Sequence, residues 1–214
     1  MASKSRKMYL VLSAMVGLII SLASATLADN LITNGSFESP VCGNDSQQIP
    51  AGWTWSGGDI KAIMTHECAW RPAAADGTQY VMMCLSSEYQ TISETAQTGH
   101  TYTLTADYGR ASSNNCPHFF KLEAVNPSDS NDVVILVDGS GLADSTKWST
   151  FSATSAVLSA DYNGWNLRVT IGTTAYWASF DNVQLTTAVP EPASMVLVGV
   201  GGLGLLLRRK YSRF

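Results

Sequence analysis

Alternating apolar and polar residues recur along the middle of the chain, which is the pattern of half-buried β-strands. In the run TYTLTADY, Tyr102, Leu104 and Ala106 fall on one face, whereas Thr103 and Thr105 fall on the other. Similar runs follow one another with short interruptions. The predicted strands cover residues 79–85, 88–93, 100–109, 118–125, 132–137, 147–155, 166–172 and 178–186.

Turn-forming residues separate these runs, and they fix the class of fold. Gly, Pro, Asn, Asp and Ser cluster between the strands because each favours tight turns. No stretch of 12 residues here keeps the helical period without meeting such a breaker. Eight short strands in about 160 residues therefore predict an all-β fold, an antiparallel sandwich of two sheets. The predicted turns cover residues 75–77, 97–100, 126–132, 138–146 and 160–164.

The first 28 residues have the pattern of a secretory signal peptide. A basic segment with Lys4, Arg6 and Lys7 precedes an apolar run at residues 8–22, and small residues follow. The alternative is an N-terminal anchor helix. It fits less well because the small residues stand at the distance that signal peptidase requires.

The C-terminal residues combine three features in a fixed order. Pro190, Glu191 and Pro192 form a triplet, an uncharged apolar run occupies residues 193–207, and a basic tail follows. The two prolines keep the triplet extended. As a helix the apolar run is about 22 Å long, which is shorter than the roughly 30 Å core of a bilayer. The basic tail would stay in the cytoplasm under the positive-inside rule.

This order resembles the PEP-CTERM sorting signal of Gram-negative bacteria, with Arg208 and Arg209 opening the basic tail. The resemblance implies that an exosortase, a membrane enzyme, recognises and removes the tail of an exported protein. Producers of such proteins usually make exopolysaccharide. The alternative is a plain C-terminal anchor. The chain thus divides into a signal peptide (1–28), a folded domain (29–187) and a sorting signal with a short transmembrane helix (188–214).

The folded domain is acidic, which restricts its partners. Between Asp29 and Val189 there are 16 acidic and 6 basic residues, a net charge of −10. Nucleic-acid binding needs clustered Lys and Arg, so this charge excludes it. The same charge disfavours anionic membrane surfaces and leaves carboxylates available for a divalent cation.

Four cysteines, Cys42, Cys68, Cys84 and Cys116, lie in the folded domain. An even number in an exported chain predicts two disulfides. Three pairings are open, and 42–68 with 84–116 is preferred. The rival interpretation is a zinc site built from the two His and two Cys of HEC and CPH, but their spacing is not that of a known finger.

Both ends of the folded domain carry recognisable sequences. It opens with NLITNGSFESP and closes with FDNVQL, and ADGTQYV and GHTYTLTADYGR lie between them. This frame resembles the galactose-binding-like jelly roll of bacterial carbohydrate-binding modules and of uncharacterised domains in PEP-CTERM proteins. The resemblance implies the fold and leaves the ligand open, because one fold hosts many functions.

The resemblance also implies a structural calcium ion. Many members of that fold hold calcium where the first and last strands meet, and the matching positions are Glu38 and Asp181. Calcium takes about six to eight oxygen ligands, so carbonyl groups of the NGS turn would complete the site. The alternative is that Glu38 caps a turn and Asp181 accepts backbone N–H bonds without a metal.

Tryptophans supply the candidate carbohydrate surface, since sugar rings pack on flat aromatic rings beside polar groups. Trp53 and Trp148 are expected in the core. The other four tryptophans lie in or beside turns, two of them next to hydrogen-bonding residues. For each of them the alternative is packing in or around the core. The candidate ligand-binding residues are Trp55, Trp70, Arg71, Trp165, Asn166 and Trp177.

No catalytic pattern emerges from the sequence. It has no GxSxG elbow, no HExxH helix, no glycine-rich phosphate loop and no outstanding pair of carboxylates. We therefore expect a non-enzymatic protein that passes through the inner membrane to the cell surface or the extracellular matrix, with carbohydrate as its candidate ligand. The alternatives are a purely structural envelope protein and a hydrolase or lyase acting on polysaccharide.

Overall fold

The structure of the protein is a computed structural model. The predicted signal peptide and nearly all of the predicted sorting signal lie outside its described residues. Within those residues no helix is long and apolar enough to cross a membrane. The described residues are 29–58, 60–65, 73–110, 117–142 and 147–189.

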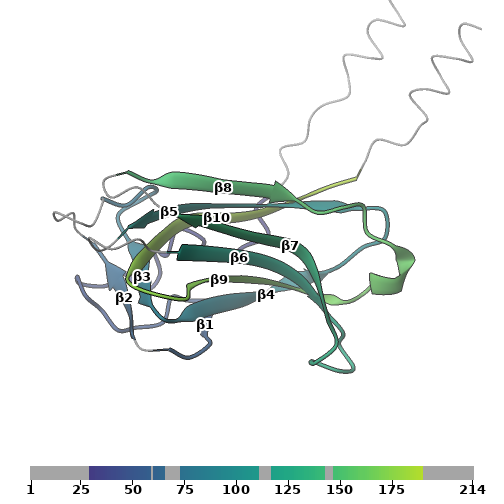
Figure 1. Ribbon diagram of the computed structural model, residues 1–214, viewed down its shortest axis with the longest axis horizontal. Helices are drawn as coiled ribbons and strands as arrows, with labels where there is room; N and C mark the ends of the chain where they lie inside the picture. Colours follow the sequence, from purple (N-terminus) through teal and green to yellow (C-terminus); the bar gives the residue numbers. More distant parts are fainter. Residues whose placement is uncertain (1–28, 59, 66–72, 111–116, 143–146, 190–214) are drawn as a thin grey trace, which may run out of the picture.

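Two antiparallel sheets of five strands each pack face to face (Figure 1). Sheet A has the order β2-β3-β10-β5-β8, and sheet B has the order β1-β4-β9-β6-β7. This arrangement confirms the predicted all-β sandwich. The strands are β1 (Thr54–Trp55), β2 (Ile60–Met64), β3 (Tyr80–Cys84), β4 (Ser87–Thr95), β5 (Thr101–Arg110), β6 (Pro117–Val125), β7 (Val133–Leu142), β8 (Ser149–Thr154), β9 (Asn166–Thr173) and β10 (Ala178–Ala188).

The eight strands expected from alternation correspond to β3 through β10. The alternation missed β1 and β2. β1 has only two residues, which is too short for a periodic signal. β2, with the sequence IKAIM, shows no regular apolar–polar alternation.

One predicted turn is wrong, because residues 138–142 continue β7 instead of leaving it. Asp138 pairs with Lys121 of β6, and the pairing goes on to the end of the strand. In the sequence, Gly139 and Gly141 of this stretch favour a turn. A Cβ atom on Gly139 would overlap the ring of Phe151, so the glycine is there to make room for an aromatic ring in the core.

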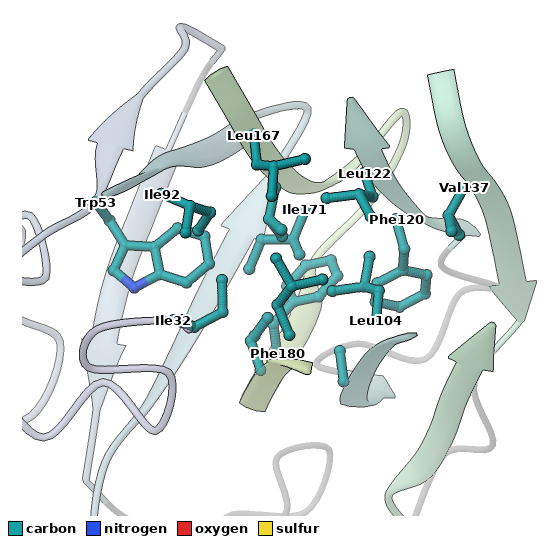
Figure 2. Packing of buried hydrophobic residues seen from close by; sticks show 14 of the residues in the cluster. Ile32, Trp53, Ile92, Leu104, Phe120, Leu122, Val137, Leu167, Ile171 and Phe180 are labelled. Atoms are coloured by element: carbon teal, nitrogen blue, oxygen red, sulfur yellow. The ribbon is translucent and has the colours of Figure 1, made fainter. Parts of the chain in front are cut away.

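The inner faces of the two sheets form the main hydrophobic core, shown in Figure 2. Phe120 of β6 stacks on Phe151 of β8, with 4.5 Å between the ring centroids. Trp53 is 5% exposed, and its ring N–H donates to the carbonyl oxygen of Asn34 at 3.1 Å. Trp53 is thereby confirmed as a core residue.

Side-chain amides hold the strandless segment before β1 against this sandwich. Gln90 of β4 bonds both backbone groups of Thr33, each at 2.8 Å. Gln79, just before β3, accepts the N–H of Cys42 at 2.7 Å and donates to the carbonyl oxygen of Phe37 at 2.7 Å. The opening sequence is thus fixed without pairing as a strand.

The connections between strands gather at two opposite ends of the sandwich. At one end, which we call the exit end, β10 finishes beside the start of β5. At the other, which we call the far end, β9 turns back into β10. β10 runs between them, and its 11 residues span about 35 Å. The described loops at the exit end are 96–100, 126–132 and 155–165, and those at the far end are 56–58, 85–86 and 174–177.

Candidate functional site

A hollow of about 240 Å³ opens at the far end of sheet B. Among the described lining residues, Phe119 of β6 contributes the one aromatic ring, and Leu85 contributes an apolar side chain. The rest of the lining is hydroxyl groups and backbone. The lining residues are Ser56, Gly57, Gly58, Leu85, Ser86, Ser87, Phe119, Thr173 and Thr174.

The ring of Phe119 lies against the outer face of the sheet because of a glycine. Phe120 faces the core, so alternation turns Phe119 outward. Its register partner on β9 is Gly172. A Cβ atom on Gly172 would lie 2.5 Å from Cζ of Phe119 and 2.7 Å from the carbonyl oxygen of Ser86. Any side chain at this position would displace the ring.

Backbone hydrogen bonds fix the rim of the hollow. The N–H of Ser56 donates to the carbonyl oxygen of Ser87 at 2.9 Å, and the N–H of Leu85 donates to that of Ala175 at 3.1 Å. Gly58 has a φ of 107°, and a Cβ atom there would overlap the carbonyl oxygen of Leu85. The shape of the rim therefore depends on Gly58 and on the two backbone hydrogen bonds made by Ser56 and Leu85.

A polar group lies beside the hollow on the outer face of sheet B. Arg168 Nε donates to Glu123 Oε2 at 2.8 Å, and the hydroxyl of Thr170 donates to the same oxygen at 3.3 Å. Lys121 Nζ stands 5.9 Å from the centroid of the Phe119 ring. Hydrogen-bonding groups are thus ordered next to an aromatic surface, as binding sites for polar ligands require.

The described lining of the hollow has no acidic, basic or thiol side chain. Two titratable neighbours of the lining residues point into the sandwich: Glu88, next to Ser87, is 0% exposed, and His118, next to Phe119, is 1% exposed. Acid–base catalysis needs such a group within reach of the substrate. The described lining residues therefore supply hydroxyl, backbone and apolar groups to a ligand, and no acid–base group.

Glu38 and Asp181, the predicted calcium ligands, approach the same loop at 75–79. Glu38 Oε1 accepts the backbone N–H groups of Thr78 and Gln79 at 2.7 and 2.6 Å. Its Oε2 accepts the hydroxyl of Thr78 at 2.7 Å. The two carboxylates thus fasten the first segment of the domain and its last strand to one loop.

Asp181 is the more unusual of the two because it is buried. Its Oδ2 accepts the N–H groups of Ala75 and Asp76 at 2.7 and 3.0 Å, and its Oδ1 accepts that of Asn182 at 2.7 Å. Burial raises the pKa of Asp181 to about 7, although these hydrogen bonds lower it. No Lys or Arg side chain among the described residues pairs with it.

The three predicted sugar-binding tryptophans that the structure describes lie in different places. Trp55 pairs in register with the buried Glu88, and its ring nitrogen is buried. Trp165 packs on the main core at the exit end, 5.3 Å from the ring of Tyr162. Trp177 packs on a second apolar cluster, on the outer face of sheet A. Asn166 opens β9 next to Trp165.

Among the described residues, Cys42 is a free thiol. Its preferred partner Cys68 and the fourth cysteine, Cys116, lie outside the described residues. Both predicted disulfides therefore stay predictions.

Several other predicted residues also lie outside the described ranges. They come from the predicted carbohydrate-binding residues, the predicted disulfides and the predicted sorting signal. They are Trp70, Arg71, Cys68, Pro190, Glu191, Pro192, Arg208 and Arg209.

Sequence reasoning missed Phe119, the central residue of the hollow. The adjacent phenylalanines of HFFKLEAV carried a signal, since only one of them can face the core of a two-sheet sandwich. Its partner Gly172 gave no signal, because the pairing of β6 with β9 is a property of the topology.

Two families match the sequence. Residues 28–186 match the HpiC1-like family, described as HpiC1 cyclase. Residues 188–210 match the PEP-CTERM protein-sorting motif. Among curated proteins, none matches the chain.

Similar solved structures include carbohydrate-binding modules. The CBM22-1 xylan-binding domain from Paenibacillus barcinonensis Xyn10C has a TM-score of 0.53 at 15% identity, covering 76% of this chain and 97% of that chain. The CBM22-1-CBM22-2 tandem domain of the same protein scores 0.56 at 16% identity, covering 79% and 49%. Arabinose-bound MgGH51 α-L-arabinofuranosidase scores 0.52 at 13% identity, covering 74% and 26%. At these identities the likeness shows the fold alone.

The comparisons confirm the predicted sorting signal and the jelly-roll class of fold. The PEP-CTERM motif implies export, processing by an exosortase and sorting to the cell surface. The domain match spans nearly all of the folded region, from the residue before Asp29 to Thr186 of β10. The chain therefore belongs to the HpiC1-like family and carries a PEP-CTERM sorting motif.

Proposed function

We propose that this protein is a non-enzymatic surface or matrix protein that binds carbohydrate in the hollow at the far end of sheet B. The observation that carries the proposal is the Phe119 ring, which lies over Gly172 in a hollow whose other described lining is hydroxyls, backbone and the side chain of Leu85. The apolar face of a sugar packs on such a ring. The hydroxyls of Ser56, Ser87 and Thr174 bond the edge of the sugar.

The size of the hollow suits one sugar ring of a longer chain. Its volume of about 240 Å³ is below the roughly 300–1,000 Å³ of pockets that enclose a drug-sized ligand. The remainder of the polysaccharide lies along the open outer face of sheet B. Arg168, Glu123 and Thr170 are placed there to bond its hydroxyls.

The route to the ligand follows from the two terminal signals. Signal peptidase removes residues 1–28, and the tail holds an intermediate in the inner membrane of a Gram-negative bacterium. Exosortase then removes the tail. The processed protein meets exopolysaccharide at the cell surface or in the matrix, which makes that polymer the natural first ligand to test.

A cyclase is the second candidate, favoured by the description of the matching family. A cyclase that uses acid–base catalysis needs a proton donor or acceptor at the bound substrate. The described lining of the hollow provides none, and Asp181 is enclosed by backbone N–H groups. These observations support binding over catalysis.

Affinity electrophoresis tests the proposal directly. The exported domain is run through gels containing the exopolysaccharide of the producing organism. We expect Phe119→Ala to abolish most of the retardation. Val157→Ala, which removes an exposed apolar side chain from the loop 155–165 at the exit end, serves as the control.

The same gels separate the rival sites and functions. Loss of retardation in Trp55→Ala, Trp165→Ala or Trp177→Ala, but not in Phe119→Ala, would place the site elsewhere. No retardation of the wild-type domain would favour a structural envelope protein. A fall in the chain length of the recovered polysaccharide would reveal a hydrolase or lyase.

We also propose that calcium binds between Glu38 and Asp181 as a structural ion. The residues fit a cation in charge, since Asp181 is a buried carboxylate that no Lys or Arg side chain of the described residues pairs with. No group of three or more His, Cys, Asp or Glu residues surrounds a common point in the described ranges. Backbone carbonyls would therefore supply most of the ligands, and the ion would lock the first segment to the last strand.

A further inference from the structure

We propose that the tail-bearing precursor stands end-on at the membrane with its hollow directed away from the lipid, so that it binds its ligand before exosortase acts. The statement about the ligand rests on the proposed function, and the statement about orientation does not. Two features support it: the short connection to the sorting motif in the sequence and the place of the hollow among the described residues.

The connection between fold and membrane is short. β10 is still paired at Ala188, where the hydroxyl of Thr101 donates to the carbonyl oxygen of Ala188 at 3.3 Å. The Pro-Glu-Pro triplet begins at residue 190, and the apolar run begins at 193. Residues 189–192 span at most about 14 Å when fully extended. The exit end is therefore held close to the membrane surface.

The hollow lies at the other end of β10. Thr173 and Thr174 line it and lead through a short turn to Ala178, where β10 begins. The strand then runs about 35 Å to the exit end. A domain held upright by the end of β10 therefore presents the hollow at its most distant point.

The competing pose lays sheet B on the membrane and would cover the hollow with lipid. Lys121 and Arg168 are the cations of that face. Arg168 is paired with Glu123, and Asp138 stands opposite Lys121 in register. The face therefore offers little net attraction to anionic lipid that would draw sheet B down onto the membrane.

Fluorescence quenching in nanodiscs tests the orientation without any ligand. The chain with its tail is placed in nanodiscs containing phosphatidylglycerol and headgroup-spin-labelled lipid. A fluorescent amino acid replaces one of three residues of similar exposure: Val157 at the exit end (56%), Tyr176 at the far end (54%) or Ile135 on sheet B (49%). We expect quenching several-fold stronger at Val157 than at the other two positions.

The other quenching patterns would overturn the orientation. Quenching at Ile135 that equals or exceeds that at Val157 means that sheet B lies on the membrane. Stronger quenching at Tyr176 means that the domain is inverted. Equal quenching at all three positions means that the domain tumbles on its connection.

Binding of fluorescent exopolysaccharide to the same nanodiscs tests the ligand statement. We expect the anchored chain and the free domain to bind with the same affinity. Binding by the free domain alone would sink this inference and leave the proposed function intact. Binding by neither would sink the proposed function, and the quenching result would still decide the orientation.

Discussion

Buried amide side chains replace strand pairing at the start of this domain. Gln79 is 1% exposed and bonds three backbone groups, those of Phe37, Pro40 and Cys42. A buried polar backbone group left without a partner is costly. The amide therefore matters more for stability than a single polar side chain usually does.

Replacing Gln79 by Leu should lower the free energy of unfolding by about 3 kcal/mol, because it leaves three backbone groups unsatisfied. Urea denaturation measures the change. Gln97→Ala, at an exposed loop position, should change it by less than about 0.5 kcal/mol. Equal effects of the two variants would show that the amide bonds are not needed.

Replacing Gly172 by Ala should destabilise the domain by about 1–3 kcal/mol, because the new methyl group meets the Phe119 ring and the backbone of Ser86. Chemical denaturation checks this. Gly43→Ala is the matched control, since a Cβ atom there meets nothing within 4 Å. A neutral Gly172→Ala would mean that the ring does not rest on the sheet.

The sequence predicted whether some side chains lie in the core, and it did not predict this for others. Trp53 was placed in the core by its sequence context, and Phe119 was inferable from alternation. The tryptophans beside turns were harder. A turn position does not say whether a large ring folds back onto the sandwich, as Trp165 and Trp177 do.

At the scale of elements, alternation predicted strands well wherever one face is buried. It missed β1 because that strand is too short, and it missed β2 because its residues do not alternate. It also missed the end of β7, because a glycine can either form a turn or make room for a neighbouring side chain. Glycine signals a turn when its φ is unusual. At residue 139 it makes space for a neighbouring ring, which only the packed structure reveals.

Calcium should stabilise the loop at 75–79 together with the elements that hold it. Adding calcium to EDTA-treated protein at about 100 times its dissociation constant should add about 2.7 kcal/mol to the free energy of unfolding. Thermal denaturation with and without calcium measures this as a rise in Tm.

Variants of the two carboxylates decide whether that rise comes from the proposed site. We expect Glu38→Gln and Asp181→Asn to abolish it. Asp107→Asn, which alters a carboxylate bonded to Thr150 and Asn182 on sheet A, should retain it. A full calcium response in Asp181→Asn, or none in the wild type, would rule out calcium at this site.

At the scale of the whole molecule, the sequence predicted the class of fold and the sorting tail, and it missed the place of the hollow. The alternation of apolar and polar residues reveals which faces of the strands are buried, and the sorting tail is recognised from one continuous sequence motif. The hollow is assembled from β4, β6, β9 and three separate loops. Its position depends on strand order, which a local pattern does not contain.

Replacing Pro190, Glu191 and Pro192 by Ala should leave the tail attached, because exosortase would no longer recognise it. Mass spectrometry of the envelope fraction should then show the mass of the uncleaved chain. The Gln97→Ala protein should be cleaved as the wild type is. Normal release of the triple variant would favour a plain anchor over a sorting signal.

The place of β10 in sheet A has a consequence for biogenesis. β10 is the last strand in the chain, yet it lies between β3 and β5 in the middle of the sheet. Asn30, at the start of the domain, bonds the backbone of Leu185 and Val183. A chain threaded through the secretion pore from its N-terminus cannot close sheet A until residue 188 has emerged. By then the apolar run at residues 193–207 has reached the pore, so we expect the last strand to fold only when export of the domain is nearly complete.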